Sequence, residues 1–524
     1  MIRASFLLLF LAASTAFAAD IPDYDLVIRH GRIIDGSGSP ARAGDVAIRD
    51  GRIVAVGAAP GTARQEIDAT GKVVTPGFID VHTHAEELKD LPVAENFLRM
   101  GVTTIITGNC GFSDVNLGEY FATLTRTGIA INVGALIGQG AVRAQVMGGS
   151  FMRPATEPEL EQMRGLVAQA MKDGAVGMST GLIYLPGTYT RTEELIELAK
   201  VAAAGGGIYA SHMRYESTRI FEALDELVRI AREAKIPAEV SHIKLSGPNA
   251  WGQTAKVVDL LNRARAEGLK IAQDQYAYTA SSTGIATLVP SDVREGGDEK
   301  FRARLADPAQ KARMIAAMKE TLVSGARGDF SYAVIASYEY DPKLNGKSIA
   351  QAAKQIRGSD SIEDQIEIIF DIVAHGGAAG VFHGMDEADL QKFMVLPETM
   401  IASDAAPRKF GDSVPHPRGY GNNARVLGRY VRELKLLTLE DAVRKMTSLP
   451  ATTFQLARRG LLAPGNVADV AVFDPAQVSD PSTFDDPHHY ALGFSDVIVN
   501  GVPVILAGEL TEARPGRPVR LRDE

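Results

Sequence analysis

Two histidines at the end of a short apolar run are the first residues that could do chemistry together. The run covers residues 77–84 and ends in His82-Thr83-His84. Alternate residues of a strand point to the same face, so a strand that ends in His-x-His presents both imidazoles where they can share a metal ion. The motif therefore predicts a metal site, and a chance pairing of histidines at a strand end is the alternative.

Four further residues with metal-binding side chains follow other predicted strands. Residues that served only the core or the surface would have no reason to gather at one rim of a barrel. With the two histidines they offer the N, S and O ligands that suit Zn²⁺, so we expect a zinc centre at this rim. They are Cys110 after the second strand, His212 after the fifth, His242 after the sixth and Asp404 after the eighth.

The elements that must position these residues form a repeating pattern. Between about residue 76 and residue 460, short apolar segments alternate with segments of helical spacing. This alternation predicts an α/β fold, a (β/α)8 barrel of the TIM type, which carries its active site at the carboxyl ends of the strands. The eight predicted strands are residues 77–81, 103–108, 131–137, 175–180, 207–212, 238–244, 270–278 and 399–404.

Three stretches do not fit the barrel pattern. Residues 19–75 and 461–524 both contain short alternating segments, and we expect them to join in one small β-sandwich domain beside a barrel of residues 76–460. The interval between the seventh and eighth strands is too long for a single crossover. We therefore expect an insertion after strand 7, an inserted subdomain at about 285–360.

Composition and charge limit the classes of molecule that we expect the protein to bind. The chain has 524 residues, a net charge of -9 and no run rich in lysine and arginine, so we expect a small-molecule substrate and no nucleic acid. Residues 1–18 have a basic start, an apolar core and Ala16-Phe17-Ala18, which is typical of a secretory signal peptide. The apolar core is shorter than the roughly 20 residues of a spanning helix. We expect cleavage after Ala18, export to the periplasm or the medium, and no membrane span in the mature chain.

The single cysteine, Cys110, cannot form a disulfide within the chain. A buried thiol in the hydrophobic core is the ordinary role for such a residue. The alternative is a thiolate bound to metal, whose negative charge would offset Zn²⁺ in a site otherwise built of neutral imidazoles.

As a set, these motifs resemble those of the D-aminoacylases, the N-acyl-D-amino-acid deacylases of the amidohydrolase superfamily. The resemblance covers nearly the whole mature chain. Two positions depart from the family pattern: Ile243, where a second histidine is common, and Ala405, where glycine is usual. The matching motifs are His82-Thr83-His84, Gly108-Asn109-Cys110-Gly111, Ser211-His212-Met213-Arg214, Ser241-His242-Ile243-Lys244 and Ser403-Asp404.

The resemblance implies zinc-dependent hydrolysis of the amide bond of N-acyl-D-amino acids to a carboxylate and a free D-amino acid. It also implies that Asp404, beside the metal, is the general base and acid, taking a proton from water and delivering it to the leaving nitrogen. The implied zinc ligands are Cys110, His212 and His242 at one tight site, with His82 and His84 at a second, weaker site that shares Cys110.

A substrate with a free carboxylate needs cationic or hydroxyl partners. The resemblance offers Lys244, Tyr276, Ser282 and Arg418 for this role. Two other functions stay open. One is another amidohydrolase, such as a cyclic-amide hydrolase or a dipeptidase, because fold and metal do not define the substrate. The other is an inactive binding protein on the same fold, which the complete set of ligands disfavours.

Overall fold

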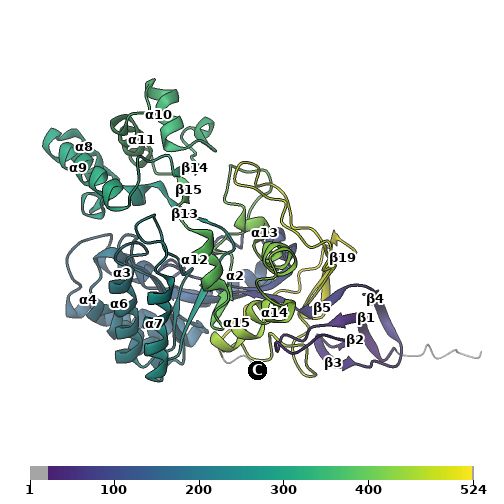
Figure 1. The fold of residues 1–524 in the computed structure, drawn as a ribbon. Helices are drawn as coiled ribbons and strands as arrows, with labels where there is room; N and C mark the ends of the chain where they lie inside the picture. The colour runs from purple at the N-terminus through teal and green to yellow at the C-terminus, as the bar shows by residue number, and fades with distance from the viewer. Residues whose placement is uncertain (1–21, 522–524) are drawn as a thin grey trace, which may run out of the picture.

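An eight-stranded parallel sheet forms the centre of the computed structural model, which describes residues 22–521 (Figure 1). The expected signal peptide, residues 1–18, lies outside the described residues. The strands run in the order β16-β12-β11-β10-β9-β8-β7-β6, and each coincides with one predicted segment. The predicted α/β barrel is confirmed. Its strands are β6 (Phe78–Asp80), β7 (Val102–Thr107), β8 (Asn132–Gly138), β9 (Gly177–Gly181), β10 (Ile208–His212), β11 (Ala238–Val240), β12 (Ile271–Gln275) and β16 (Thr399–Ile401).

Backbone contacts between the first and the last strand close the sheet into a barrel. Thr83, just after β6, forms a parallel bridge with Ala405, just after β16. The amide of Asp404 donates to the carbonyl of His82 at 2.9 Å. The amide of His84 donates to the carbonyl of Ala405 at 2.8 Å. Closure therefore brings the His-x-His motif against Asp404.

Helices cover the barrel, and several of them are amphipathic and present one apolar face to it. The helix α4 buries Met163, Val167 and Met171, and α7 buries Val257 and Leu261. Within residues 22–521, no helix combines the length and the apolar character needed to cross a membrane. The helices around the barrel are α1 (Glu95–Leu98), α2 (Leu117–Thr127), α3 (Gln139–Met147), α4 (Glu157–Asp173), η1 (Gly187–Tyr189), α5 (Thr192–Ala204), α6 (Ile220–Ala234), α7 (Thr254–Ala266), α12 (Glu387–Met394), α13 (Arg418–Arg425), η5 (Val426–Glu433), α14 (Leu439–Met446) and α15 (Ser448–Thr453).

Strands from both ends of the chain form one nine-stranded sheet beside the barrel (Figure 1). The strand β1 pairs with β2, β4 and β5, and β17 from the other end pairs antiparallel with β5. Ile28 and Ile48 from the first segment share a core with Val470 and Ile498 from the last. The strands are β1 (Tyr24–Ile33), β2 (Arg42–Arg49), β3 (Arg52–Gly57), β4 (Ala63–Asp68), β5 (Val73–Pro76), β17 (Val470–Phe473), β18 (Phe494–Val499), β19 (Val502–Leu506) and β20 (Glu509–Leu510).

A separate lobe follows the seventh barrel strand and has its own core, which contains Phe301, Met318 and Phe370 (Figure 1). This inserted lobe runs from Ala280 to His383, wider than the expected 285–360, because a small sheet in the order β13-β15-β14 begins and ends it. Its elements are β13 (Ala280–Gly284), η2 (Ile285–Leu288), η3 (Ser291–Arg294), α8 (Asp298–Ala306), α9 (Pro308–Ser324), β14 (Ala333–Ser337), η4 (Pro342–Leu344), α10 (Ile349–Arg357), α11 (Ile362–Ala374) and β15 (Ala379–His383).

Candidate active site

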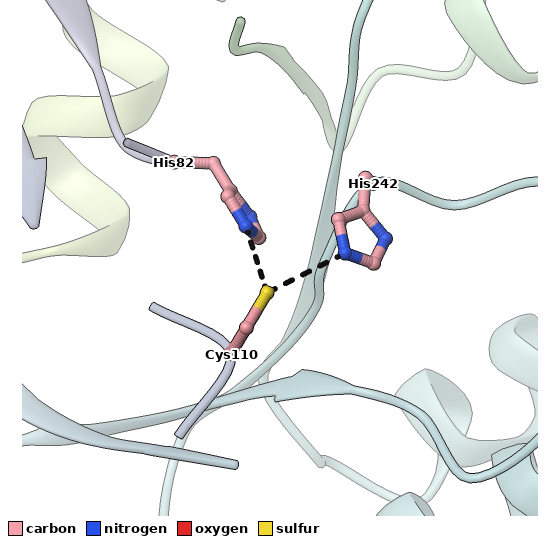
Figure 2. Close-up of side chains that lie close together, drawn as sticks. All are labelled: His82, Cys110 and His242. Carbon is pink, nitrogen blue, oxygen red and sulfur yellow. Dashed lines mark hydrogen bonds between the residues drawn. The ribbon is translucent and has the colours of Figure 1, made fainter. Parts of the chain in front are cut away.

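Three imidazoles meet around the sulfur of Cys110 at the carboxyl ends of the barrel strands. The Sγ atom lies 3.3 Å from Nε2 of His82, 3.6 Å from Nδ1 of His212 and 3.7 Å from Nε2 of His242. Figure 2 shows Cys110 with His82 and His242 turned towards its sulfur. All four side chains are buried. Tetrahedral zinc with sulfur and nitrogen ligands holds neighbouring ligand atoms about 3.5 Å apart, so the donor types and their spacing fit this metal.

A second group of possible ligands adjoins the first. Nε2 of His84 lies 3.2 Å from Oδ1 of Asp404, and Nε2 of His82 lies 3.7 Å from the same oxygen. The ligand atoms of His82, His84 and Asp404 all lie within 4.8 Å of one another, as do those of His82, Cys110 and His242. His82 thus belongs to both groups, and the arrangement can serve one metal ion or two that share ligands.

The pKa values of two acidic groups of the centre are held below their usual values. Burial opposes ionisation of the Cys110 thiol, but the charge of His82 and hydrogen bonds from other histidines hold its pKa well below the usual value. Burial also opposes ionisation of Asp404, while the Arg418 guanidinium and the charge of His82 hold its pKa well below the usual value. Nη1 of Arg418 lies 2.8 Å from Oδ2 of Asp404. A buried thiolate beside a buried carboxylate is a charge distribution that a cation balances.

The histidines of the centre are held from behind by charged groups. Nδ1 of His82 lies 3.1 Å from the Asp274 carboxylate, which also accepts the backbone N–H of His242 at 3.0 Å. Nδ1 of His242 lies 2.8 Å from Nζ of Lys244 and 3.1 Å from Oε1 of Glu216. Histidines that bind metals are commonly oriented in this way through their second nitrogen. Here the partners keep both Nε2 atoms turned towards the centre.

Three of the proposed ligands occupy strained backbone positions. The φ angle is 54° at Cys110, 38° at His242 and 53° at Asp404. For a residue other than glycine this left-handed conformation costs roughly 1–2 kcal/mol. Such strain gathers at functional sites, where the surroundings hold it in place. Each position lies just past the end of its strand, where the chain turns out of the barrel.

The four residues expected to bind a substrate carboxylate lie on one wall of the site. The ring centroid of Tyr276 is 4.7 Å from Cζ of Arg418 and 5.8 Å from Nζ of Lys244. Nη2 of Arg418 lies 3.5 Å from the backbone carbonyl oxygen of Ser282. Nζ of Lys244 lies 2.5 Å from Oε1 of Glu216, so the Glu216 carboxylate offsets the positive charge of Lys244. The structure brings all the predicted site residues together, and their roles remain predictions.

Sequence reasoning did not assign a role to three acids of the site, of which Glu239 and Asp274 are buried and Glu216 is half-buried. Glu216 follows His212 in an irregular loop, whereas Glu239 and Asp274 lie inside the barrel strands β11 and β12. Burial and the nearby Asp274 charge raise the pKa of Glu239 well above its usual value. Acids are seldom fully buried without a partner, so their presence inside segments predicted as barrel strands is the signal that could have found two of them. Glu216 has no comparable local signal.

Comparison with known proteins agrees with the geometry. Residues 65–505 match the model of the Amidohydrolase family. The chain is 35% identical to the D-aminoacylase of Alcaligenes xylosoxydans xylosoxydans over 95% of this chain and 98% of that protein. It is also 35% identical to the N-acyl-D-glutamate deacylase of the same organism, over 95% and 96% of the two chains.

A solved structure shows that the similarity includes the fold as well as the sequence. The fold matches the crystal structure of N-acyl-D-glutamate deacylase from Bordetella bronchiseptica with a TM-score of 0.81 and 33% identity, over 95% of this chain and 99% of that one. That enzyme was crystallised with zinc and a phosphonate inhibitor, a mimic of the reaction tetrahedral intermediate. The likeness therefore extends over the barrel, the nine-stranded sheet and the inserted lobe together.

Proposed function

Because this chain belongs to the amidohydrolase family, and within it to the D-aminoacylases, we propose that its reaction takes place at the Cys110 centre. The chain hydrolyses the amide bond of N-acyl-D-amino acids, as its full-length relatives do. The observation that carries the assignment of the site is the convergence of three imidazoles on the Cys110 sulfur, next to the Asp404 carboxylate.

Zinc is the metal that the donor set favours. A thiolate with imidazoles suits Zn²⁺ better than the hard cations Mg²⁺ and Ca²⁺, which prefer oxygen ligands. When bound, zinc supplies Lewis-acid chemistry, which polarises an amide carbonyl and makes water acidic enough to attack near neutral pH. The residues that would hold it are Cys110, His212 and His242 at the first site, and His82, His84 and Asp404 at the second.

Asp404 is the residue we assign to proton transfer. Arg418 holds its Oδ2, while its Oδ1 faces His84 and His82. An ionised carboxylate in this position can accept a proton from the attacking water. It can then donate that proton to the leaving nitrogen, which must be protonated before it departs as an amine.

Arg418 is also the strongest partner for the free carboxylate of the substrate. A guanidinium presents parallel N–H donors that match a carboxylate, and it keeps its charge at every relevant pH. The ring of Tyr276 and the backbone carbonyl of Ser282 lie next to Arg418, and we assign the hydroxyls of these two residues to further hydrogen bonds with this carboxylate. Lys244, paired with Glu216, is better suited to hold His242 in place.

The proposed site is tested by assaying the purified protein on N-acetyl-D-leucine and N-acetyl-L-leucine and measuring the free amino acid. We expect chelator-sensitive hydrolysis of the D-isomer and little of the L-isomer. A metal-loaded protein that hydrolyses neither isomer, but opens a cyclic amide such as a hydantoin, would overturn the proposal in favour of the alternative amidohydrolase.

We also propose that the protein is exported, which rests on the sequence of residues 1–18 alone. The mass of the mature protein recovered from the periplasm or the medium tests this. A chain that keeps its first residues and stays in the cytoplasm would contradict it.

A further inference from the structure

A groove between the barrel and the inserted lobe lies beside the centre. It consists of two adjoining cavities of about 230 Å³ and 510 Å³, which share part of their walls. The inner cavity includes Glu216, whose carboxylate lies 3.1 Å from His242 of the centre. A substrate arm that extends from the scissile bond past His242 towards the lobe can therefore enter this groove. The shared wall consists of Ile183, Thr287, Leu288, Thr321 and Ser324.

Hydroxyl side chains are frequent in the wall of the inner cavity. Serine and threonine supply eight of the seventeen residues that line it, and Asn249 adds an amide. Glu216 is the one acid among the described residues of this wall, and the Lys244 ammonium at 2.5 Å offsets its charge. The remaining cation, Arg327, is thus the charge that a ligand in this cavity meets.

Arg327 lies just past α9 and lacks a carboxylate partner. Its Cζ atom is 3.6 Å from the ring centroid of Tyr332, and its Nη1 donates to the backbone carbonyl of His383 at 3.2 Å. Burial lowers the pKa of the guanidinium, and the only described group that opposes this is Tyr332. A half-buried cation without a counterion is destabilising unless something else supplies the negative charge.

The outer cavity also contains an arginine without a carboxylate partner. Nε of Arg294 is buried without a hydrogen-bond partner, and burial lowers the pKa of this guanidinium with only Tyr189 opposing it. By contrast, Arg214 in the same wall is paired with Glu226 at 2.9 Å. The acid of this cavity, Glu320, is exposed to solvent. Two guanidiniums without carboxylate partners therefore face one groove.

We propose that this groove binds a second carboxylate of the substrate and that Arg327 selects for it. The proposal rests on the function proposed above, because it concerns an arm of an N-acyl-D-amino acid held at the Cys110 centre. The guanidinium can bind the carboxylate through two N–H donors, and the surrounding hydroxyls can complete its hydrogen bonds. The second carboxylate can come from the amino-acid side chain, as in a D-glutamate derivative, or from a dicarboxylic acyl group, as in a succinyl amide.

Two pairs of nearly isosteric substrates test the proposal and separate these sources. One pair is N-acetyl-D-glutamate and N-acetyl-D-glutamine, and the other is N-succinyl-D-alanine and its succinamoyl analogue. We expect the unmodified enzyme to prefer the charged member of one pair by at least about tenfold in kcat/KM, which identifies the source. Arg327→Met should lower kcat/KM for that charged member by about 10- to 100-fold and leave its neutral partner within about twofold. Arg327→Lys should keep part of the preference.

A matched control comes from the helix that precedes Arg327. Arg313 of α9 is exposed and paired with Asp292 at 2.9 Å, so Arg313→Met should leave both pairs unchanged. Equal loss for the charged and neutral members in Arg327→Met would assign this residue to holding the lobe in place, and would overturn the proposal. If the unmodified enzyme hydrolyses the neutral members as well as the charged ones, the proposal of a second-carboxylate site is also overturned, but the proposed function stands. If N-acetyl-D-leucine and all four members of these pairs resist hydrolysis by the metal-loaded enzyme, the proposed function itself has failed.

Discussion

Buried charged groups lie at both ends of the barrel strands, and they are arranged differently. At the amino end of β8, the Asp469 carboxylate accepts hydrogen bonds from the Asn132 side chain at 3.2 Å, from the Asn500 amide at 2.8 Å and from Arg459. At the carboxyl end, the sulfur of Cys110 and the imidazole nitrogens around it face one common point. The amino-end cluster joins the nine-stranded sheet to the barrel, whereas the carboxyl-end cluster surrounds the proposed metal centre.

The difference shows that buried charge alone does not mark a functional site. The oxygens of Asp469 are matched by donors from the protein itself, so this cluster needs nothing further. At the Cys110 centre, several lone-pair donors are brought together, and only protons or a cation can satisfy them jointly. Removing a member of each cluster should therefore have opposite consequences: loss of metal at one end and loss of stability at the other.

The largest effect is expected from Cys110→Ala, which removes the atom at the middle of the centre. Bound metal should be lost, and kcat/KM should fall by at least about 1000-fold, because the chemistry depends on the metal. Elemental analysis and the D-amino-acid assay measure both quantities. A variant that kept its metal and its activity would return Cys110 to the role of an ordinary core thiol.

Asp404→Asn should separate metal binding from proton transfer. The amide keeps the shape of the side chain but cannot accept the proton, so kcat should fall by about 100- to 10000-fold while most of the metal is retained. Comparing metal content with single-turnover rates checks this. Near-normal turnover would remove Asp404 from the proposed proton transfer.

Asp469→Ala is the matching change at the amino end. It leaves the Arg459 charge buried and unpaired, which should lower the free energy of unfolding by about 3–5 kcal/mol. The folded fraction should keep its metal content and its kcat/KM within about twofold. Unfolding by denaturant, followed beside activity, measures the effect. A selective loss of metal would erase the distinction between the two clusters.

Asp274→Asn should have the smallest effect of these changes. The variant keeps the size of the side chain behind His82 but weakens its hold on Nδ1. Support of this kind typically accounts for about 10- to 100-fold in metal affinity. Competition with a chromogenic chelator measures the affinity. A change as large as that of Cys110→Ala would indicate that Asp274 does more than orient the imidazole.

The sequence could predict the carboxyl-end cluster because its members belong to local patterns. Each of His82, Cys110 and His242 stands just past an apolar strand, and the parallel barrel brings such positions to one rim. The partners behind them were harder to predict. Glu216 meets His242 through the fold of an irregular loop, which no spacing rule describes.

The amino-end cluster and the bounds of the inserted lobe depend on long-range pairing. Asn132 and Asp469 are separated by most of the barrel sequence, and no local pattern connects them. Similarly, Ala280 pairs with His383 across the whole lobe. The strand β13 has the sequence Ala-Ser-Ser-Thr-Gly, which is too polar to be recognised as a strand, and the expected insertion was therefore too narrow.

Stepwise addition of zinc to metal-free protein, with bound metal and hydrolysis of N-acetyl-D-leucine followed together, tests the central claim most directly. We expect no hydrolysis without metal and a rise in activity in proportion to the first equivalent bound. The same titration of the Cys110→Ala variant should restore neither binding nor activity. Full activity in metal-free protein, or zinc that binds at Cys110 without bringing activity, would contradict the assignment of this centre.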